Sequence, residues 1–389
     1  MADAQGLFGP YPASREASGT SWQPQSTPIG GYHFSRGPWM VMVHGFADAV
    51  YDRQGGPRGD ADAFVPNMGM LMAQRPAGRG TLGLRAMLSL EPATVGSYGY
   101  PLLLQTGETA DGREPLVDRQ HPHDLFMELG VGYSRSFRGH GSAFAYLAFP
   151  GEPAVGPPTF MHRFSGMSLP EAPLVHHWLD STHISFGVAT IGVAWKGVKI
   201  EGSSFTGREP DEHRWGFDSP KFDSFAGRLS LNATADWALQ LSAARLRGPE
   251  QLEPDADVDR FTASASYNRP LRGGANWQTT AAWGHNRSEG RNLDGLLLES
   301  TWWSGRRHTL FARAEIVEKD ELFPNEPLAH AIFDVGKLSA GYIYDFGVAS
   351  SVRFGIGALG SVFRLPAELE PAYGNSPRSF MLFVRGVVR

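Results

Sequence analysis

Apolar side chains occupy every second position in about sixteen segments of about ten residues, from about Pro38 to the C-terminus. A period of two is that of a β-strand with one apolar and one polar face. In one segment Leu82, Leu84 and Leu88 alternate with Arg85 and Met87. In another Ile184 and Phe186, expected on the apolar face, alternate with Ser185. The pattern therefore predicts an all-β chain, without a break from residue 38 onward.

The connections between these segments alternate between tight and long. The tight connections comprise residues 77–80, 136–141, 196–198, 232–236, 269–275, 304–308 and 346–348. The long ones comprise residues 52–65, 92–123, 150–181, 207–220, 248–257, 286–291, 318–332 and 363–378. Short periplasmic turns and long extracellular loops are typical of outer-membrane barrels. We predict a transmembrane, antiparallel up-and-down β-barrel of about sixteen strands over residues 38–389, with periplasmic termini.

A soluble β-sandwich would also show two-sided alternation. The apolar face, however, carries Trp and Tyr near the strand ends, as the aromatic girdles of a membrane barrel require. The number of strands is also large for one sandwich, and the opposite face mixes both signs of charge, as a hydrated lumen would. The residues predicted to line the pore are Arg85, Glu128, Lys199, Arg228, Arg313 and Arg353.

The composition of the 389-residue chain narrows the class of protein further. The mean hydropathy is −0.26, and no run approaches the ~20 apolar residues of a spanning helix. A barrel needs no such run, because only alternate residues of a strand face lipid. A net charge of −5 argues against a nucleic-acid partner, and the absence of cysteine is compatible with an oxidising periplasm.

Residues 1–37 differ from the rest of the chain, because they are rich in Pro, Gly, Ser and Gln and have no period. We predict an extended periplasmic arm that is mobile unless a partner binds it. The segment lacks the basic and apolar regions of a signal peptide. We therefore expect a mature chain in a bacterial outer membrane, its signal peptide removed. The sequence is compatible with a homo-oligomer and with a periplasmic partner bound through residues 1–37.

Histidines concentrate in the two longest loops: seven of the thirteen in the chain lie between His121 and His183. Proline-rich loop 150–181 is expected to fold inward and narrow the pore. The candidate metal ligands are His121, His123, Asp124, His176, His177, Asp180 and His183. Imidazole suits zinc and copper, but the same side chains can form a structural polar network. The sequence establishes no cofactor, and a divalent or soft metal ion is one of the two interpretations.

Methionines are the second unusual feature. Met68, Met70 and Met72 alternate along the second predicted strand. If they faced the lumen beside His44, they would form a row of thioethers suited to a soft cation. Since the residues between them are less apolar, hydrophobicity favours lipid-facing methionines.

Nothing in the sequence specifies a catalytic site. Asp180, Ser181 and His183 lie close together, but along a strand Asp180 would point away from the other two. A nucleophile needs its base within hydrogen-bond reach and a third group that orients the base. We expect a protein that is not an enzyme.

Four long stretches carry a resemblance to a known family: DRQHPHDLFMELG (118–130), GEPAVGPPTFMHRFSGMSLPEAP (151–173), HHWLDSTHISFG (176–187) and FTGREPDEHRW (205–215). From about Trp39 onward the chain resembles a porin-like family of Gram-negative outer-membrane β-barrel proteins. Members of this family often accompany heavy-metal efflux systems, notably for copper. The resemblance implies a metal-linked role and supplies no ligand set.

The function predicted first is a porin-like channel for small hydrophilic solutes or ions, constricted by the histidine-rich loops 92–123 and 150–181. The first alternative is a protein that binds copper or zinc and takes part in heavy-metal efflux or resistance. The second is a plugged barrel that serves as a scaffold for a partner. In each case outer-membrane lipid and lipopolysaccharide are the expected surroundings.

Overall fold

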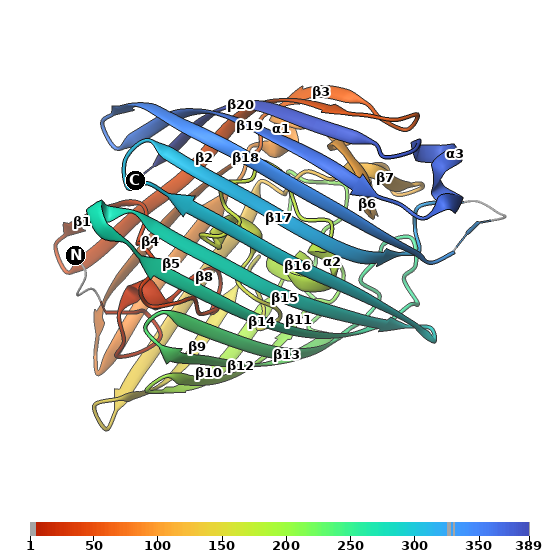
Figure 1. The fold of residues 1–389 in the computed structure, drawn as a ribbon. Helices are drawn as coiled ribbons and strands as arrows, with labels where there is room; N and C mark the ends of the chain where they lie inside the picture. Colours follow the sequence, from red (N-terminus) through yellow and green to blue (C-terminus); the bar gives the residue numbers. More distant parts are fainter. Residues whose placement is uncertain (1–4, 325–327, 330, 389) are drawn as a thin grey trace.

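The computed structural model describes residues 5–324, 328–329 and 331–388, and sixteen of its strands form one closed antiparallel barrel (Figure 1). The wall consists of β2 (Trp39–Gln54), β4 (Asn67–Ala77), β5 (Gly80–Leu88), β8 (Phe126–Phe137), β9 (Gly141–Ala148), β10 (Val188–Trp195), β11 (Val198–Phe205), β12 (Ser224–Thr234), β13 (Trp237–Leu246), β14 (Val258–Pro270), β15 (Asn276–Ser288), β16 (Arg291–Trp303), β17 (His308–Lys319), β18 (Phe333–Ala349), β19 (Val352–Arg364) and β20 (Arg378–Val388). Each strand pairs with the next, and β20 pairs with β2 to close the ring. The predicted fold is confirmed.

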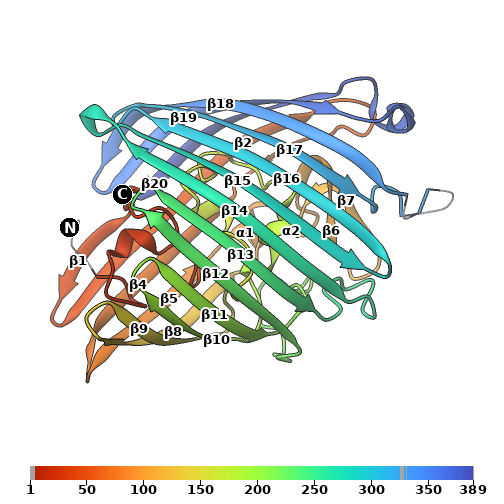
Figure 2. The ribbon, with the colours of Figure 1, turned by 60° about the horizontal axis from the view of Figure 1, so that its bottom comes forward.

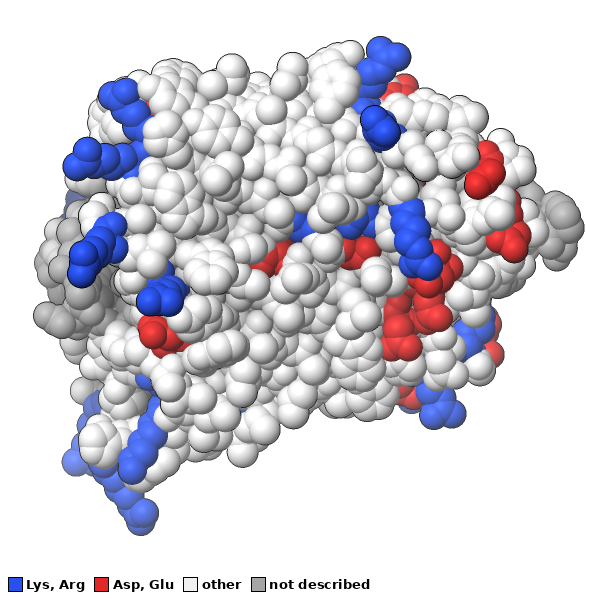
Figure 3. Space-filling view, in the orientation of Figure 1, with Lys and Arg blue, Asp and Glu red and all other residues white. Residues whose placement is uncertain are grey.

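The outer surface of the wall is apolar, as the alternation predicts. The lipid-facing side chains include Ile191, Ile200, Phe225, Leu241, Leu298, Leu310, Leu338, Ile356 and Leu382. Lys, Arg, Asp and Glu gather mainly towards the two ends of the barrel and leave a largely uncharged band between them (Figure 3). Side chains at the intervening positions face inward: Asp48 of β2 pairs with Arg385 of β20 at 2.6 Å. None of the helices among the described residues is long and apolar enough to cross a membrane.

Tight turns lie at the end of the barrel where β20 also ends, and most long loops lie at the other end (Figures 1 and 2). Two predicted connections differ. The tight turn expected at residues 346–348 lies at residues 350–351, because β18 continues to Ala349. The loop expected at residues 286–291 is a two-residue turn, in which Glu289 and Gly290 have φ of 49° and 81°. Positive φ at both central residues suits a tight hairpin.

The remaining elements belong to the arm and the connections. The first 3-10 helix (Ala13–Arg15) lies in the arm, and β1 (Tyr32–Arg36) pairs with the start of β2. The long loops contain β3 (Ala61–Phe64), α1 (Glu91–Thr94), β6 (Tyr100–Thr109), β7 (Pro115–Gln120), α2 (His176–Leu179), α3 (Glu370–Tyr373) and 3-10 turns at Phe160–His162, Ser181–His183 and Ala367–Leu369. A further 3-10 turn, Arg272–Gly274, joins β14 to β15. Strands β6 and β7 form a separate two-stranded sheet.

Residues 5–30 pack mainly inside the lumen and are not the free arm that their composition predicts. Leu7, Phe8, Tyr11 and Trp22 are buried among side chains of the wall. Wall side chains donate hydrogen bonds to arm carbonyl oxygens, for example Ser134 Oγ to Leu7 at 2.6 Å. Composition alone misses this packing, because the lumen supplies the partners that the isolated segment lacks. Residues 1–4 of the predicted arm lie outside the described part of the chain, as do residues 325–327 and 330 of loop 318–332 and Arg389.

The second long loop also lies inside the barrel. Nearly all residues from 151 to 187 are buried, and β10 begins only at Val188. Ile184 and Phe186, which the alternation predicts to face lipid, are therefore loop residues buried in the interior. The alternation of these few residues is indistinguishable from that of a strand end. The arm and this loop therefore both fill part of the lumen.

Candidate functional site

Five imidazoles meet in the lumen and form what we call the histidine network: His121, His123, His176, His177 and His183. All five side chains are buried. Neighbouring ring centroids are 5.2–6.5 Å apart, from 5.2 Å between His123 and His183 to 6.5 Å between His121 and His176. The structure thus brings together every histidine that the sequence singles out as a candidate ligand, from two loops far apart in the chain.

Local structure explains how the loops present these rings. His121 and His123 directly follow β7, whose end is held by the β6–β7 pairing of Tyr100 with Gln120. His176 and His177 occupy one short helical turn, α2, and their rings are perpendicular, with centroids 5.5 Å apart. The 3-10 turn that follows carries His183, whose Nδ1 lies 2.9 Å from the carbonyl oxygen of Asp180.

Carboxylates face four of the five rings. The contacts, each between a ring nitrogen and a carboxylate oxygen, are His123–Glu91 at 2.8 Å, His176–Asp180 at 2.7 Å, His121–Glu108 at 3.3 Å and His177–Glu209 at 3.5 Å. Glu250 also approaches His177, at 3.8 Å. Buried polar groups need such partners, because an unpaired one costs roughly 1–3 kcal/mol.

Two arginines hold the carboxylates that the sequence predicts as metal ligands. Arg163 lies 2.8 Å from Asp180, and Arg214 lies 3.2 Å from Asp124. Arg214 also pairs with Glu108, and Arg163 pairs with Glu299 of the wall at 2.7 Å. Asp124 and Asp180 are therefore already paired with guanidinium groups. Neither carboxylate needs a metal ion to balance its charge.

Protonation differs between members of the network. Burial lowers the pKa of His121 and His183 well below the usual range, and lowers the pKa of His176 to about 4. Burial alone would also lower the pKa of His177, but Glu209 and Glu250 raise it to about 9. At neutral pH three rings are therefore uncharged, while His177 is an imidazolium held between two carboxylates.

At one part of the histidine network the candidate ligand atoms lie close enough together to share a metal ion. The ligand atoms of His177, Glu209 and Glu250 all lie within 4.8 Å of one another. Among the residues that the structure describes, the other such group, Asp211, Glu212 and His213, lies outside the network in loop 206–223. Nε2 of His177 and Nε2 of His183 are buried without a hydrogen-bond partner among the described residues. His177 is thus the predicted ligand whose surroundings fit a metal ion best.

The six residues predicted to line the pore face inward but contact other parts of the chain. Arg85 donates a hydrogen bond to the carbonyl oxygen of Gly19, and Lys199 to that of Thr20, so both hold the arm. Arg228 lies 2.9 Å from Glu201 and 2.9 Å from Thr20 Oγ1. All three are almost fully buried.

The other three of the six also have partners within the barrel. Tyr146 donates to Glu128 at 2.6 Å, and Arg313 lies 3.3 Å from Glu299. Arg353 lies 3.1 Å from Asp345 and is the most accessible of the set. Most of these charges therefore anchor the lumen filling, while Arg353 keeps contact with solvent.

Apart from the two predicted aspartates, the sequence does not identify as site residues the carboxylates that face the histidines or the residues of the adjoining arginine ion pairs. They are Glu91, Glu108, Arg163, Glu209, Arg214, Glu250 and Glu299. Three of them, Glu209, Arg214 and Glu250, lie in the strongly polar stretches 205–215 and 246–260, whose charge is the one signal available in the sequence. Nothing local marks Glu91 or Glu299 as different from other inward carboxylates.

No protein-family model matches the chain, and no curated protein matches it either. Solved structures do match over almost the whole length. OmpF of Salmonella typhi, solved with daunomycin, gives a TM-score of 0.55 at 9% identity and covers 92% of this chain and 100% of that one. OprB of Pseudomonas putida gives 0.53 at 10% identity, covering 90% and 94%.

The anion-selective porin from Comamonas acidovorans gives 0.51 at 11% identity, covering 90% of this chain and 99% of that one. At such identities the likeness establishes the fold. This chain is an outer-membrane-type β-barrel with the architecture of the porins.

Proposed function

We propose that the protein is an outer-membrane channel that passes small hydrophilic solutes or ions through a lumen narrowed by the arm and the two longest loops. The apolar outer surface suits lipid and the outer leaflet of a bacterial outer membrane. The channel class is proposed by analogy with the porins whose fold the chain shares.

The observation that carries this proposal is the filled, charged lumen of a sixteen-stranded wall. A barrel of this size leaves an aqueous channel unless loops fill it. Here the arm and residues 151–187 occupy much of the interior. What passes must therefore be small, and the charges that remain accessible, such as Arg353, contribute to selectivity.

Planar-bilayer recording tests the channel. The purified protein is expected to give discrete steps of low conductance, smaller than those of a sixteen-stranded porin with an open lumen, because the arm and loops exclude most of the cross-section. The reversal potential in a salt gradient then gives the ion preference. A protein that inserts but carries no current over the whole voltage range contradicts the proposal and supports the scaffold alternative.

Metal binding in the histidine network is the second candidate function, favoured by the ligand distances of His177, Glu209 and Glu250. Imidazole with two carboxylates is a donor set that zinc accepts. A link to copper or other heavy-metal efflux would fit the resemblance of the chain to barrels that accompany such systems.

Elemental analysis and titration with Zn²⁺ test this candidate. His177→Gln is expected to weaken zinc binding by about tenfold or more, because one of three protein ligands is lost. His140→Gln is the matched control, since His140 is exposed in the turn between β8 and β9 and belongs to neither group of candidate ligands. Equal affinity of wild type and His177→Gln would remove His177 from the ligand set.

The scaffold alternative is favoured by the packed arm. Since residues 5–30 lie mainly in the lumen, a periplasmic partner would have to contact the exposed hairpin strand β1, where Tyr32 and Phe34 are accessible. The same surface would serve a homo-oligomer.

A further inference from the structure

Methionines gather in one part of the lumen. Of the eleven in the chain, nine line one cavity or pack beside it: Met40, Met42, Met68, Met70, Met72, Met87, Met127, Met161 and Met167. The cavity has a volume of about 1000 Å³ and lies between the arm, strands β2, β4 and β5, and loop 150–187. We call it the methionine pocket. The prediction that Met68, Met70 and Met72 face lipid is wrong.

Strand register places these thioethers on the lumenal face. Across β2 and β4, Met42 pairs with Met72 and His44 pairs with Met70. Across β4 and β5, Met70 pairs with Met87. Directly paired residues share one face of a sheet, and His44 lines the cavity. A comparison of hydrophobicity within β4 alone does not reveal this orientation. It becomes clear from the pairing of β4 with β2 and β5.

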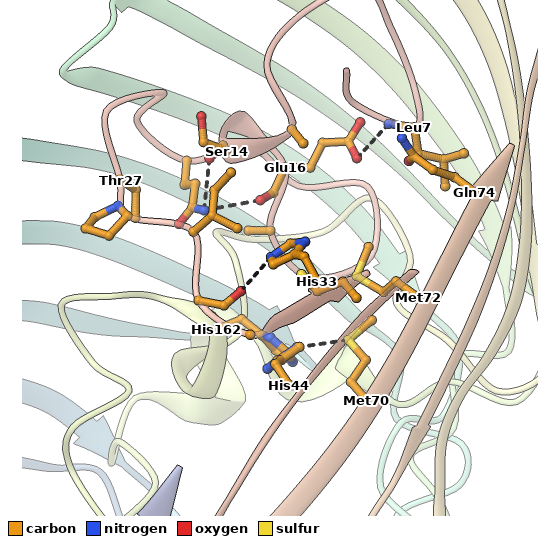
Figure 4. Close-up of a pocket in the computed structure, with 18 of the residues that line it drawn as sticks. Leu7, Ser14, Glu16, Thr27, His33, His44, Met70, Met72, Gln74 and His162 are labelled. Atoms are coloured by element: carbon orange, nitrogen blue, oxygen red, sulfur yellow. Dashed lines mark hydrogen bonds between the residues drawn. The ribbon is translucent and has the colours of Figure 1, made fainter. Parts of the chain in front are cut away.

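Two imidazoles lie among the sulfurs. His44 Nε2 is 3.2 Å from Met70 Sδ, and His162 Nε2 is 3.4 Å from Met87 Sδ. The two rings lie edge to face, with centroids 5.3 Å apart and an interplanar angle of 76°. Figure 4 places His44, Met70 and His162 together on one side of the pocket. Metal bonds of ~2.0–2.3 Å allow two ligands of one ion to lie up to ~4.4 Å apart, so each pair has the spacing of a shared ion.

The charges beside the pocket do not favour a hard divalent cation. Glu16 lines it, but its carboxylate accepts hydrogen bonds from the backbone N–H groups of Leu7 and Phe8 at 3.0 and 2.8 Å. Arg85 also lines it and lies 3.8 Å from Glu16 and 3.9 Å from Glu128. The donors left for a ligand are neutral sulfur and imidazole nitrogen. Thioethers select soft ions such as Cu(I).

Packing alone accounts poorly for this arrangement. Methionine often fills irregular gaps in cores, and a gap filler should leave no space beside it. Here Met40, Met42 and Met72 are partly exposed on the wall of a large cavity, and Met167 is 38% exposed. The sulfurs of these four residues are therefore accessible from the cavity, while Met70, which lines it, and Met87, which packs beside it, are almost fully buried.

We propose that the methionine pocket binds one soft monovalent cation, Cu(I) or Ag(I), with ligands drawn from His44, Met70, His162 and Met87. The site is separate from the histidine network and binds by a different chemistry, thioether sulfur in place of carboxylate. It does not depend on passage of ions through the barrel.

Silver is the probe, since Ag⁺ needs no reductant. The purified full chain in detergent and chloride-free nitrate buffer is titrated with Ag⁺ by calorimetry. Saturable binding of one ion per chain is expected, unaffected by Zn²⁺. Met70→Leu conserves volume but removes a sulfur and is expected to weaken binding by about tenfold or more, as is His44→Gln. Met381→Leu is the matched control, because Met381 is buried on β20 outside the pocket.

X-ray absorption at the silver edge gives an independent reading. Sulfur and nitrogen neighbours are expected in the wild type, with fewer sulfurs in Met70→Leu. Circular dichroism and the heat-dependent gel mobility of the barrel establish that each variant is folded. Oxygen neighbours alone, or an equal loss of affinity in Met381→Leu, overturns the proposal. A barrel that carries no current but binds Ag⁺ in this way separates this site from the proposed channel.

Discussion

Deletion of residues 5–30 is expected to raise the single-channel conductance severalfold. The arm fills the lumen near the tight-turn end, where Leu7, Phe8 and Trp22 pack against Phe144 and Tyr146 of β9 and their neighbours. Conductance increases with the open cross-section of a pore, so removing this segment widens the narrowed region. Planar-bilayer recording of the deletion variant beside the full chain measures the change.

Adding the peptide of residues 5–30 in trans is the control for this deletion, and it is expected to return the conductance towards that of the full chain. The wall should remain intact, because its strands pair with one another and, through β2, with β1, and not with residues 5–30. If the deletion variant folds and its conductance equals that of the full chain, the arm does not limit the passage.

Replacement of Arg163 by Met is expected to free the second loop from the wall. Burial lowers the pKa of Arg163, but Glu299 and Asp180 outweigh this effect and raise it above its ordinary value. The ion pairs measure 2.7 and 2.8 Å. Breaking a buried pair by removing one partner costs about 3–5 kcal/mol. Because Arg313 and His176 still contact the two carboxylates, we expect about 3 kcal/mol, at the low end of that range.

Hydrogen exchange of backbone amides in residues 151–187 measures this loss. A local opening that is easier by about 3 kcal/mol accelerates exchange by about a hundredfold. Arg163→Lys keeps one charge and should show a smaller effect, and adding Glu299→Gln to Arg163→Met should recover part of the loss. Unchanged exchange in Arg163→Met would mean that other contacts hold the loop.

Alternation within single strands was sufficient to predict the wall. Leu239 and Leu241 face lipid and Gln240 faces inward, because a strand turns successive side chains to opposite faces whatever its neighbours are. Most tight turns were also predicted, because each is a short gap between two alternating segments. The pattern failed at Ile184 and Phe186, where a buried loop imitates a strand, and at Met70, whose orientation depends on its pairing with His44.

The candidate sites depended on contacts that no local pattern contains. The concentration of histidines predicted that these rings form either a metal site or a structural polar network. The fold does bring His121 and His177 to a centroid distance of 6.0 Å. The carboxylate partners of His177 come from other loops: Glu209 and Glu250 are separated from it by more than thirty residues. Such pairings depend on which loops meet inside the closed barrel. The sequence predicts the barrel but does not determine which loop tips come together.

The anchors of the arm have a consequence for assembly. They include side chains of β5, β8, β9, β11, β12, β14 and β15, for example Ser134, Asn232 and Asn268, which donate to carbonyl oxygens of the arm at 2.6, 2.9 and 2.8 Å. These strands surround a common interior only after the sheet has curled and joined. The segment that precedes the first wall strand in the chain can therefore complete its hydrogen bonds only after strands that follow it have curved around a shared interior.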